Sequence, residues 1–164
     1  KNKLIKTICI GNIYLGGTGK TPTVIKVYDI AKRLNFNVVS AKKFYKNQKD
    51  EHLLIEKNGT PLIIEKDRSS SIRLAEKEFN FAILDDGFQD YGIKKDLSIL
   101  CFHNKQLIGN GYIFPAGPLR ENLSAIKNAQ IAIINGEKNE IFESKLKKFN
   151  SNLKVFYSKY KLIN

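Results

Sequence analysis

Methionine and tryptophan are absent from this 164-residue sequence, and cysteine occurs only twice. A natural chain starts with methionine, so its absence and the abrupt start at Lys1 lead us to expect that N-terminal sequence is missing. Cys9 and Cys101 both lie within apolar, strand-like runs. We therefore expect two buried free thiols and a cytosolic protein, since disulfides belong to oxidising compartments.

Long hydrophobic runs are also lacking. No apolar stretch approaches the roughly 20 residues that cross a bilayer, and no signal peptide is recognisable. His52 and His103 stand alone, without the spacing of metal ligands, so structural roles are expected for both. With 42% hydrophobic residues, the chain is long and apolar enough to form one domain with a core.

Acidic residues are few, with 16 Asp and Glu against 28 Lys and Arg, which gives a net charge of +12. Such an excess is typical of proteins that meet nucleic acid, an anionic membrane surface or acidic small substrates. The basic residues are mostly scattered lysines, without an arginine-rich stripe and interleaved aromatics, so no nucleic acid is expected as a partner. A solvated lysine-rich surface and a phosphorylated or lipid substrate are the two remaining interpretations.

The most informative stretch, Thr7–Thr23, reads TICIGNIYLGGTGKTPT. An apolar run leads into a glycine-rich turn and then a helix from Lys20, which is the strand–loop–helix plan of a phosphate-binding loop. Glycines let backbone N–H groups approach phosphate oxygens, and the helix start adds its positive dipole end. Lys20 would reach the nucleotide phosphates and the Thr21 hydroxyl would bind Mg²⁺. The candidate nucleotide contacts are Tyr14, Leu15, Gly16, Gly17, Thr18, Gly19, Lys20 and Thr21.

The loop is a variant, because Tyr14 stands where the usual G-x-x-x-x-G-K-[ST] pattern has glycine. A glycine-rich strand–helix turn that holds no ligand is the alternative interpretation. The Gly-Lys-Thr triplet and its context favour phosphate binding.

Apolar strand patterns alternate with helical patterns along the chain. Strands are expected at 8–10, 38–39, 61–65, 81–84, 97–102, 131–134 and 155–157, and helices at 20–34, 52–57, 69–78, 121–128 and 141–149. Segments 41–49 and 107–119 are expected to be loops. Several strands are apolar throughout, which predicts an α/β fold with a mostly parallel sheet, helices on both faces and a P-loop NTPase-like site at the carboxyl ends of the strands. No linker divides the chain, so one domain is expected over residues 1–164.

Three carboxylates are candidates for chemistry. Asp85 and Asp86 follow a buried strand, where carboxylates can hold Mg²⁺ and are costly without a nearby cation. A turn that happens to use Asp-Asp-Gly is the alternative. Asp50 is the candidate general base, since phosphoryl transfer to an alcohol needs a carboxylate that accepts the hydroxyl proton. A helix N-cap explains Asp50 equally well.

Further polar residues are candidates for phosphate or metal contacts. Arg120 follows the proline-braced PAGPL segment and could stabilise charge on a transferring phosphoryl group, with Glu121 beside it. Arg68 could play a similar role, and Gln89 could form a hydrogen bond near the metal. Ordinary surface positions are the alternative for these residues.

Six segments occur in the order of one known family: GNIYLGGTGKTP, DE-x-LL-I, KDR, AILDDGFQDY, PAGPLRE-x-L and IAIING. Together they resemble the tetraacyldisaccharide 4'-kinases of lipid A biosynthesis over nearly the whole chain. The resemblance implies transfer of the ATP γ-phosphate to the 4'-hydroxyl of a tetraacylated disaccharide 1-phosphate at the cytoplasmic face of the bacterial inner membrane. It also implies ATP and Mg²⁺ as cofactors, and a lipid disaccharide and an anionic membrane surface as partners.

The resemblance also implies roles for individual residues. Asp50, Lys20 and Arg120 would be catalytic, and Arg68 and Gln89 would contact the nucleotide. Metal binding would fall to Thr21, Asp85, Asp86 and Glu121. The family's N-terminal membrane-associating helix and its C-terminal domain are expected to lie outside this sequence.

Two rival functions and one surface hypothesis complete the expectations. A P-loop NTPase switch that dimerises on ATP would have a similar loop, although such proteins usually carry lysine where this chain has Leu15. A basic nucleic-acid-binding module is the second rival. Lys42, Lys43 and Lys46 are candidate contacts to lipid phosphates. The sequence does not predict the oligomeric state.

Overall fold

The computed structural model describes residues 5–44 and 49–159, together with their side chains except those of residues 49–52. The chain divides into two compact units. The first combines Lys1–Ile10 with Lys20–Leu97, and the second combines Gly11–Gly19 with Ser98–Asn164. The expectation of one kinase domain stays a prediction.

The first unit contains parallel strands in the order β3-β2-β4-β1. Its elements are β1 (Lys6–Gly11), α1 (Lys20–Arg33), β2 (Val38–Lys43), α2 (Lys49–Lys57), β3 (Leu62–Glu65), α3 (Arg68–Ala75) and β4 (Phe81–Asp85). All five residues of β4 are buried. An inner strand of a parallel sheet is apolar throughout because both of its faces are covered.

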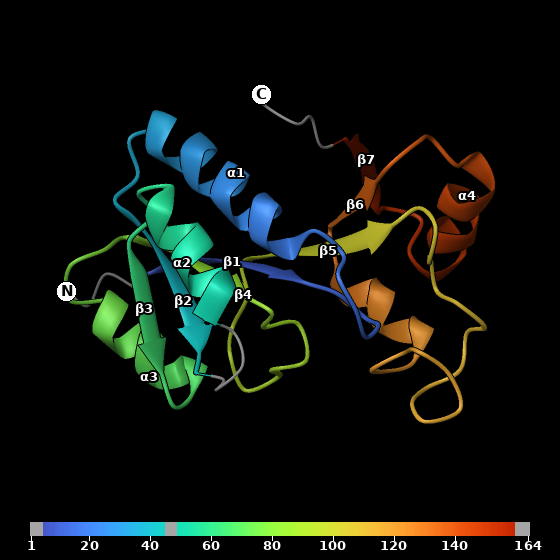
Figure 1. The fold of residues 1–164 in the computed structure, drawn as a ribbon, viewed down its shortest axis with the longest axis horizontal. Helices are drawn as coiled ribbons and strands as arrows, with labels where there is room; N and C mark the ends of the chain where they lie inside the picture. Colours follow the sequence, from blue (N-terminus) through green and yellow to red (C-terminus); the bar gives the residue numbers. More distant parts are fainter. Residues whose placement is uncertain (1–4, 45–48, 160–164) are drawn as a thin grey trace. The chain divides into compact units, whose positions relative to one another are not determined.

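Helices cover both faces of this part of the sheet. The chain runs outward from β1 through α1 to β2 and through α2 to β3, and it returns through α3 to β4. Parallel crossovers are right-handed, so the return places α3 on the face opposite α1 and α2. α1 contacts β2, β4 and α2, and α3 contacts all of β2, β3 and β4, as Figure 1 shows. The predicted parallel α/β fold is confirmed.

The second unit contains the parallel strands β5 (Leu97–His103), β6 (Ile131–Asn135) and β7 (Lys154–Ser158), in that order. A 3-10 helix, η1 (Leu123–Asn128), contacts α4 (Glu140–Phe149). α4 buries Phe142 and Leu146, which are four residues apart and therefore share one face. The Phe142 ring meets Phe102 of β5 edge-on, with centroids 5.3 Å apart.

Three local details differ from the sequence-based expectations. β2 continues to Lys43, where the polar sequence predicts a loop, because Lys42 pairs with a buried carboxylate. α3 ends at Ala75, before the predicted end at residue 78, and Asp67 caps it by accepting the Ser70 N–H at 2.9 Å. Of the helix predicted over 121–128, only η1 forms, with Asn122 as its N-cap.

Cys9 and Cys101 are buried free thiols, as the sequence predicts. Burial raises the pKa of Cys9 to about 12, so this thiol stays protonated at neutral pH. Among the helices that the structure describes, none is both long enough and apolar enough to cross a membrane.

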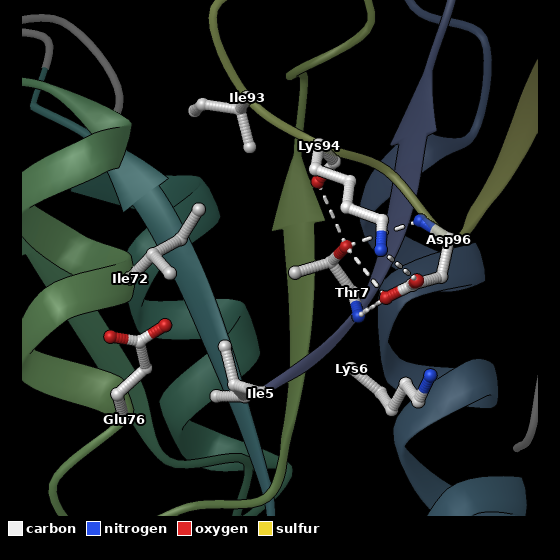
Figure 2. Close-up of a pocket in the computed structure, with 8 residues that line it drawn as sticks. All are labelled: Ile5, Lys6, Thr7, Ile72, Glu76, Ile93, Lys94 and Asp96. Carbon is white, nitrogen blue, oxygen red and sulfur yellow. Dashed lines mark hydrogen bonds and ion pairs between the residues drawn. The ribbon is translucent and has the colours of Figure 1, made fainter. Parts of the chain in front are cut away.

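The start of β1 is held by a reciprocal pair of hydrogen bonds between Thr7 and Asp96. The Asp96 carboxylate accepts the Thr7 N–H at 2.9 Å, and the Thr7 carbonyl accepts the Asp96 N–H at 3.0 Å. Figure 2 shows Thr7 and Asp96 beside a cavity of about 170 Å³ whose apolar lining is Ile5, Ile72 and Ile93. The bond from the Thr7 N–H is the main cause that holds the pKa of the Asp96 carboxyl below its ordinary value.

We expect Asp96→Ala to lower the free energy of unfolding by about 1–3 kcal/mol at pH 7, because the Thr7 N–H loses its acceptor. The folded-state pKa of Asp96 is lowered. Its contribution is therefore full above the ordinary aspartate pKa and is lost as the pH falls through the lowered value. Urea unfolding of wild type and variant over a pH series measures both effects.

Glu137→Ala is the matched control, since it breaks an exposed ion pair with Lys159. It should cost less than about 1 kcal/mol. Equal losses in the two variants would contradict the structural role of Asp96.

Candidate functional site

The glycine-rich loop, Gly11–Gly19, belongs to the second unit. Gly16 and Gly17 are exposed, whereas the Thr18 hydroxyl is buried with no hydrogen-bond partner in the described part of the chain. Gly16 has φ +123° and Gly19 has φ +81°, which other residues rarely adopt. The shape of this loop therefore requires glycine at both positions.

Two asparagines that the sequence analysis missed hold carbonyl groups of the loop. Asn12 Nδ2 donates to the Tyr14 carbonyl at 2.8 Å, and the side-chain amide of Asn135, at the end of β6, donates to the Thr18 carbonyl. Carbonyl oxygens repel phosphate oxygens, so tying these two carbonyls to side chains lowers the repulsion that an anion would meet at the loop. The position of Asn135 at the carboxyl end of a strand is a signal that could have identified it.

Tyr14 anchors the loop in the core of the second unit. Its side chain is fully buried, and its hydroxyl accepts the His103 N–H at 2.7 Å. Burial raises the pKa of Tyr14 to about 12, so the hydroxyl stays neutral. The predicted nucleotide contact by Tyr14 is therefore limited to its backbone, because the side chain that replaces glycine here points into the protein.

Arg120 lies beside the loop within the second unit. Its N–H donates to the Ile13 carbonyl at 2.8 Å, and the Leu15 N–H donates to the Pro118 carbonyl at 2.7 Å. Arg120 and Glu121 are both half-buried. The structure thus brings Arg120 next to the loop, while its catalytic role and the metal role of Glu121 stay predictions.

α1 opens with Lys20 and Thr21 and belongs to the first unit. Lys20 Nζ lies 3.6 Å from Asp86 Oδ1, and both side chains are partly exposed. The first N–H groups of a helix have no partner within it, and its dipole is positive at this end. The start of α1 is therefore suited to an anion.

The two aspartates occupy the carboxyl end of β4. β4 pairs with β1 so that Asp85 lies opposite Ile10, and the Asp86 N–H donates to the Ile10 carbonyl at 2.8 Å. The Asp85 side chain is 1% exposed and lies 2.9 Å from Lys42 Nζ. Burial raises the pKa of the Asp85 carboxyl, and the Lys42 ammonium only partly opposes this.

Lys42 is a residue that the sequence analysis misjudged. Its side chain is 1% exposed, so the expectation that it contacts lipid phosphates is wrong. The cost of an unpaired buried aspartate explains why a lysine is drawn into the interior here. Lys43 is half-buried, and Lys46 lies outside the described residues.

Arg68 supports the turn that carries the two aspartates. Its guanidinium donates to the carbonyls of both Asp85, at 3.0 Å from Nη2, and Asp86. Arg68 is 5% exposed, and a Cβ on Gly87 would lie 3.3 Å from its Nε. Arg68 is thus placed to shape the turn, and its predicted nucleotide contact stays a prediction, as does that of the half-buried Gln89.

The carboxyl end of β4 offers donors that fit Mg²⁺, which prefers oxygen ligands. Asp85 Oδ1 is buried and has no hydrogen-bond partner among the residues described. Within those residues, no group of three or more His, Cys, Asp or Glu side chains could hold a metal ion by itself. A magnesium site completed by phosphate and water needs only one or two carboxylates from the protein.

Asp50, the predicted general base, is the second residue of α2. Its side chain, like that of His52, lies outside the described part of the structure. As the second residue of α2, Asp50 is not its N-cap, so that interpretation is wrong, and the role of general base stays a prediction.

These features define a class. A glycine-rich loop between a parallel strand and a helix, a lysine and threonine at the helix start, and carboxylates ending the neighbouring strand are the marks of P-loop nucleotide-binding proteins. The chain belongs to one family of that class: the sequence model of tetraacyldisaccharide-1-P 4'-kinase matches residues 3–163.

Relatives named tetraacyldisaccharide 4'-kinase align with most of the chain. The protein of Pelagibacter ubique (strain HTCC1062) is 44% identical over 166 residues, which cover 99% of this chain and 52% of that protein. The protein of Haemophilus influenzae (strain 86-028NP) is 32% identical over 153 residues, which cover 81% and 46%. The chain thus spans about half the length of the curated relatives it matches.

Solved structures show the same fold. LpxK from Aquifex aeolicus, determined in complex with ATP, matches with a TM-score of 0.68 and 27% identity over 79% of this chain and 48% of that one. The hydrogenase maturation factor HypB from Archaeoglobus fulgidus has a TM-score of 0.65 over 96% of this chain and 82% of that one. At 10% identity, HypB supports the fold alone.

We expect Lys20→Ala to weaken ATP binding by about tenfold to hundredfold, because a charged contact to phosphate is worth about 1.5–3 kcal/mol. Titration with a fluorescent ATP analogue measures this loss. Lys26→Ala removes an exposed lysine from the same helix and should leave the affinity unchanged. Equal affinities of the two variants would show that the loop and the start of α1 do not bind phosphate.

Proposed function

We propose that this chain is the ATP-binding part of a kinase that transfers the γ-phosphoryl group of ATP to the 4'-hydroxyl of tetraacyldisaccharide 1-phosphate, in lipid A biosynthesis. The observation that carries this proposal is the Lys20–Asp86 pair at the first turn of α1, directly after a glycine-rich loop in the sequence. A lysine at this point of a P-loop protein binds the β- and γ-phosphates. The name of the family supplies the acceptor.

In the proposed reaction, the acceptor oxygen forms a bond to the γ-phosphorus as the bond to the ADP oxygen breaks. The glycine-rich loop at residues 16–19 and the Lys20 ammonium hold the phosphates, with Arg68 and Gln89 as further nucleotide contacts. Arg120 stabilises the charge that develops during transfer. Mg²⁺ would neutralise phosphate charge, and the residues proposed to hold it, directly or through water, are Thr21, Asp85, Asp86 and Glu121.

Asp50 is the proposed general base that accepts the proton of the sugar hydroxyl. The other candidate carboxylates are less suited to this task, because Asp85 is paired with Lys42 and Asp86 with Lys20. Both are also proposed Mg²⁺ ligands, and a carboxylate that binds a cation is not available to accept the hydroxyl proton. Asp50 lies on α2, a different element.

The proposed substrate carries acyl chains, which belong in a membrane. We therefore propose that the protein works as a peripheral protein at the cytoplasmic face of the bacterial inner membrane. Its net charge of +12 supports attraction to anionic lipid headgroups.

The proposal is tested in the P. ubique relative with its matched segment replaced by this chain. We expect label from γ-labelled ATP on tetraacyldisaccharide 1-phosphate in detergent micelles with Mg²⁺. Asp50→Asn should lower kcat by about a hundredfold or more, as the loss of a general base does. Asp29→Asn makes the same change on α1, away from the proposed machinery, and should leave kcat unaltered.

Other outcomes point to other functions. Label released only as free phosphate, together with ATP-dependent dimerisation, would favour the NTPase switch. Salt-dependent RNA binding that ignores MgATP would favour the nucleic-acid module. Transfer at the wild-type rate by Asp50→Asn would remove Asp50 from the role of base.

A further inference from the structure

Lys42 and Asp85 form a fully buried ion pair at the carboxyl end of the sheet in the first unit. Lys42 Nζ lies 2.9 Å from Asp85 Oδ2, and each side chain is 1% exposed. The pairing of β2 with β4 sets Ala41 opposite Leu84, so the next residues, Lys42 and Asp85, come together. Burying both charges costs their hydration, which makes such a pair weak as a source of stability. Its position suggests a role in the site instead.

The ion pair occupies only one oxygen of the Asp85 carboxylate. The other, Oδ1, is buried and has no hydrogen-bond partner among the described residues. An ammonium that holds Oδ2 fixes the rotation of the carboxylate about its bond to Cβ. Oδ1 is then kept in one direction, as a metal ligand must be.

Arg68 fixes the backbone of the same turn. Its guanidinium donates to the carbonyls of Asp85 and Asp86. Asp86 has φ +54°, a left-handed conformation that is uncommon outside glycine, although aspartate adopts it more readily than most residues. In this conformation Asp86 Oδ1 lies 3.6 Å from Lys20 Nζ. Arg68 thus fixes the backbone of the turn, and Lys42 fixes the side chain of Asp85, its first residue.

We propose that Lys42 is a positioning residue for phosphoryl transfer, which acts through Asp85 by holding Oδ2 so that Oδ1 stays available to the Mg²⁺ that accompanies ATP. This proposal rests on the proposed function. Lys42 itself does not contact the nucleotide, because its ammonium is buried against Asp85. Its role therefore differs from that of Lys20, which is partly exposed at the start of α1.

A double-mutant cycle on the chain tests this role without relying on turnover. A fluorescent ATP analogue is titrated with and without Mg²⁺ against wild type, Lys42→Met, Asp85→Asn and the double variant. The tightening is the factor by which Mg²⁺ lowers the Kd of the analogue. In each single variant this factor should be about tenfold smaller than in wild type, while the Kd without Mg²⁺ should change by less than about threefold. The double variant should lose no more than Asp85→Asn alone, since Lys42 acts only through Asp85.

Two further variants separate positioning from simple loss of charge or of fold. Lys42→Arg keeps a cation and should recover at least half of the lost tightening. Lys77→Met removes an exposed lysine of the same unit and should leave the tightening within about twofold of wild type. If Lys42→Met does not fold, Lys42→Arg and the double variant carry the test, because neither leaves an unpaired buried charge.

The outcomes distinguish this proposal from the proposed function. Wild-type tightening in Lys42→Met, or losses that add in the double variant, would overturn the positioning role alone. Wild-type tightening in the double variant would also remove Asp85 from the proposed Mg²⁺ ligands. Failure of wild type to bind the analogue at all, with or without Mg²⁺, would overturn the proposed function and this inference with it.

Discussion

The first unit of this protein depends on the register in which β4 pairs with its two neighbours. That register sets Asp85 opposite Ile10 on one side and brings it to Lys42 on the other. Side chains alternate between the faces of a sheet, so a slip of one residue would turn the Asp85 carboxylate to the opposite face, away from the lysine. The buried apolar residues of β4 hold the register, and the candidate site follows from it.

Charge balance at the end of β4 explains how two adjacent carboxylates are tolerated there. Lys42 pairs with Asp85, Lys20 pairs with Asp86, and the Arg68 guanidinium donates to the backbone carbonyls of the turn. Arg68 Nη1 also lies 4.0 Å from Asp90 Oδ2, so three cations stand against three carboxylates. The suitability of this region for an anionic ligand therefore comes from the start of α1, where the helix dipole is positive.

The loop in the second unit meets a different requirement. The Tyr14 and Thr18 carbonyls accept hydrogen bonds from asparagine side chains, and the Tyr14 ring is buried. Gly16 and Gly17 remain exposed at the surface of the loop. The family of the chain gives this arrangement its context: P-loop proteins whose curated members are named tetraacyldisaccharide 4'-kinases. The phosphate loop, the lysine–aspartate pair and the family together support ATP as the ligand.

The sequence by itself determined the glycine-rich loop, the alternation of strands and helices, the burial of both cysteines and the family. These features are written in short stretches of chain, through glycine spacing, apolar periodicity and motif order. Only the tertiary structure decided that Lys42 lies in a strand against Asp85, that Arg68 holds the aspartate turn, and that Tyr14 serves the core. Each of these depends on a partner far away in the sequence. Pairing a buried charge or packing a buried ring changes the free energy by more than the local preference of the segment does.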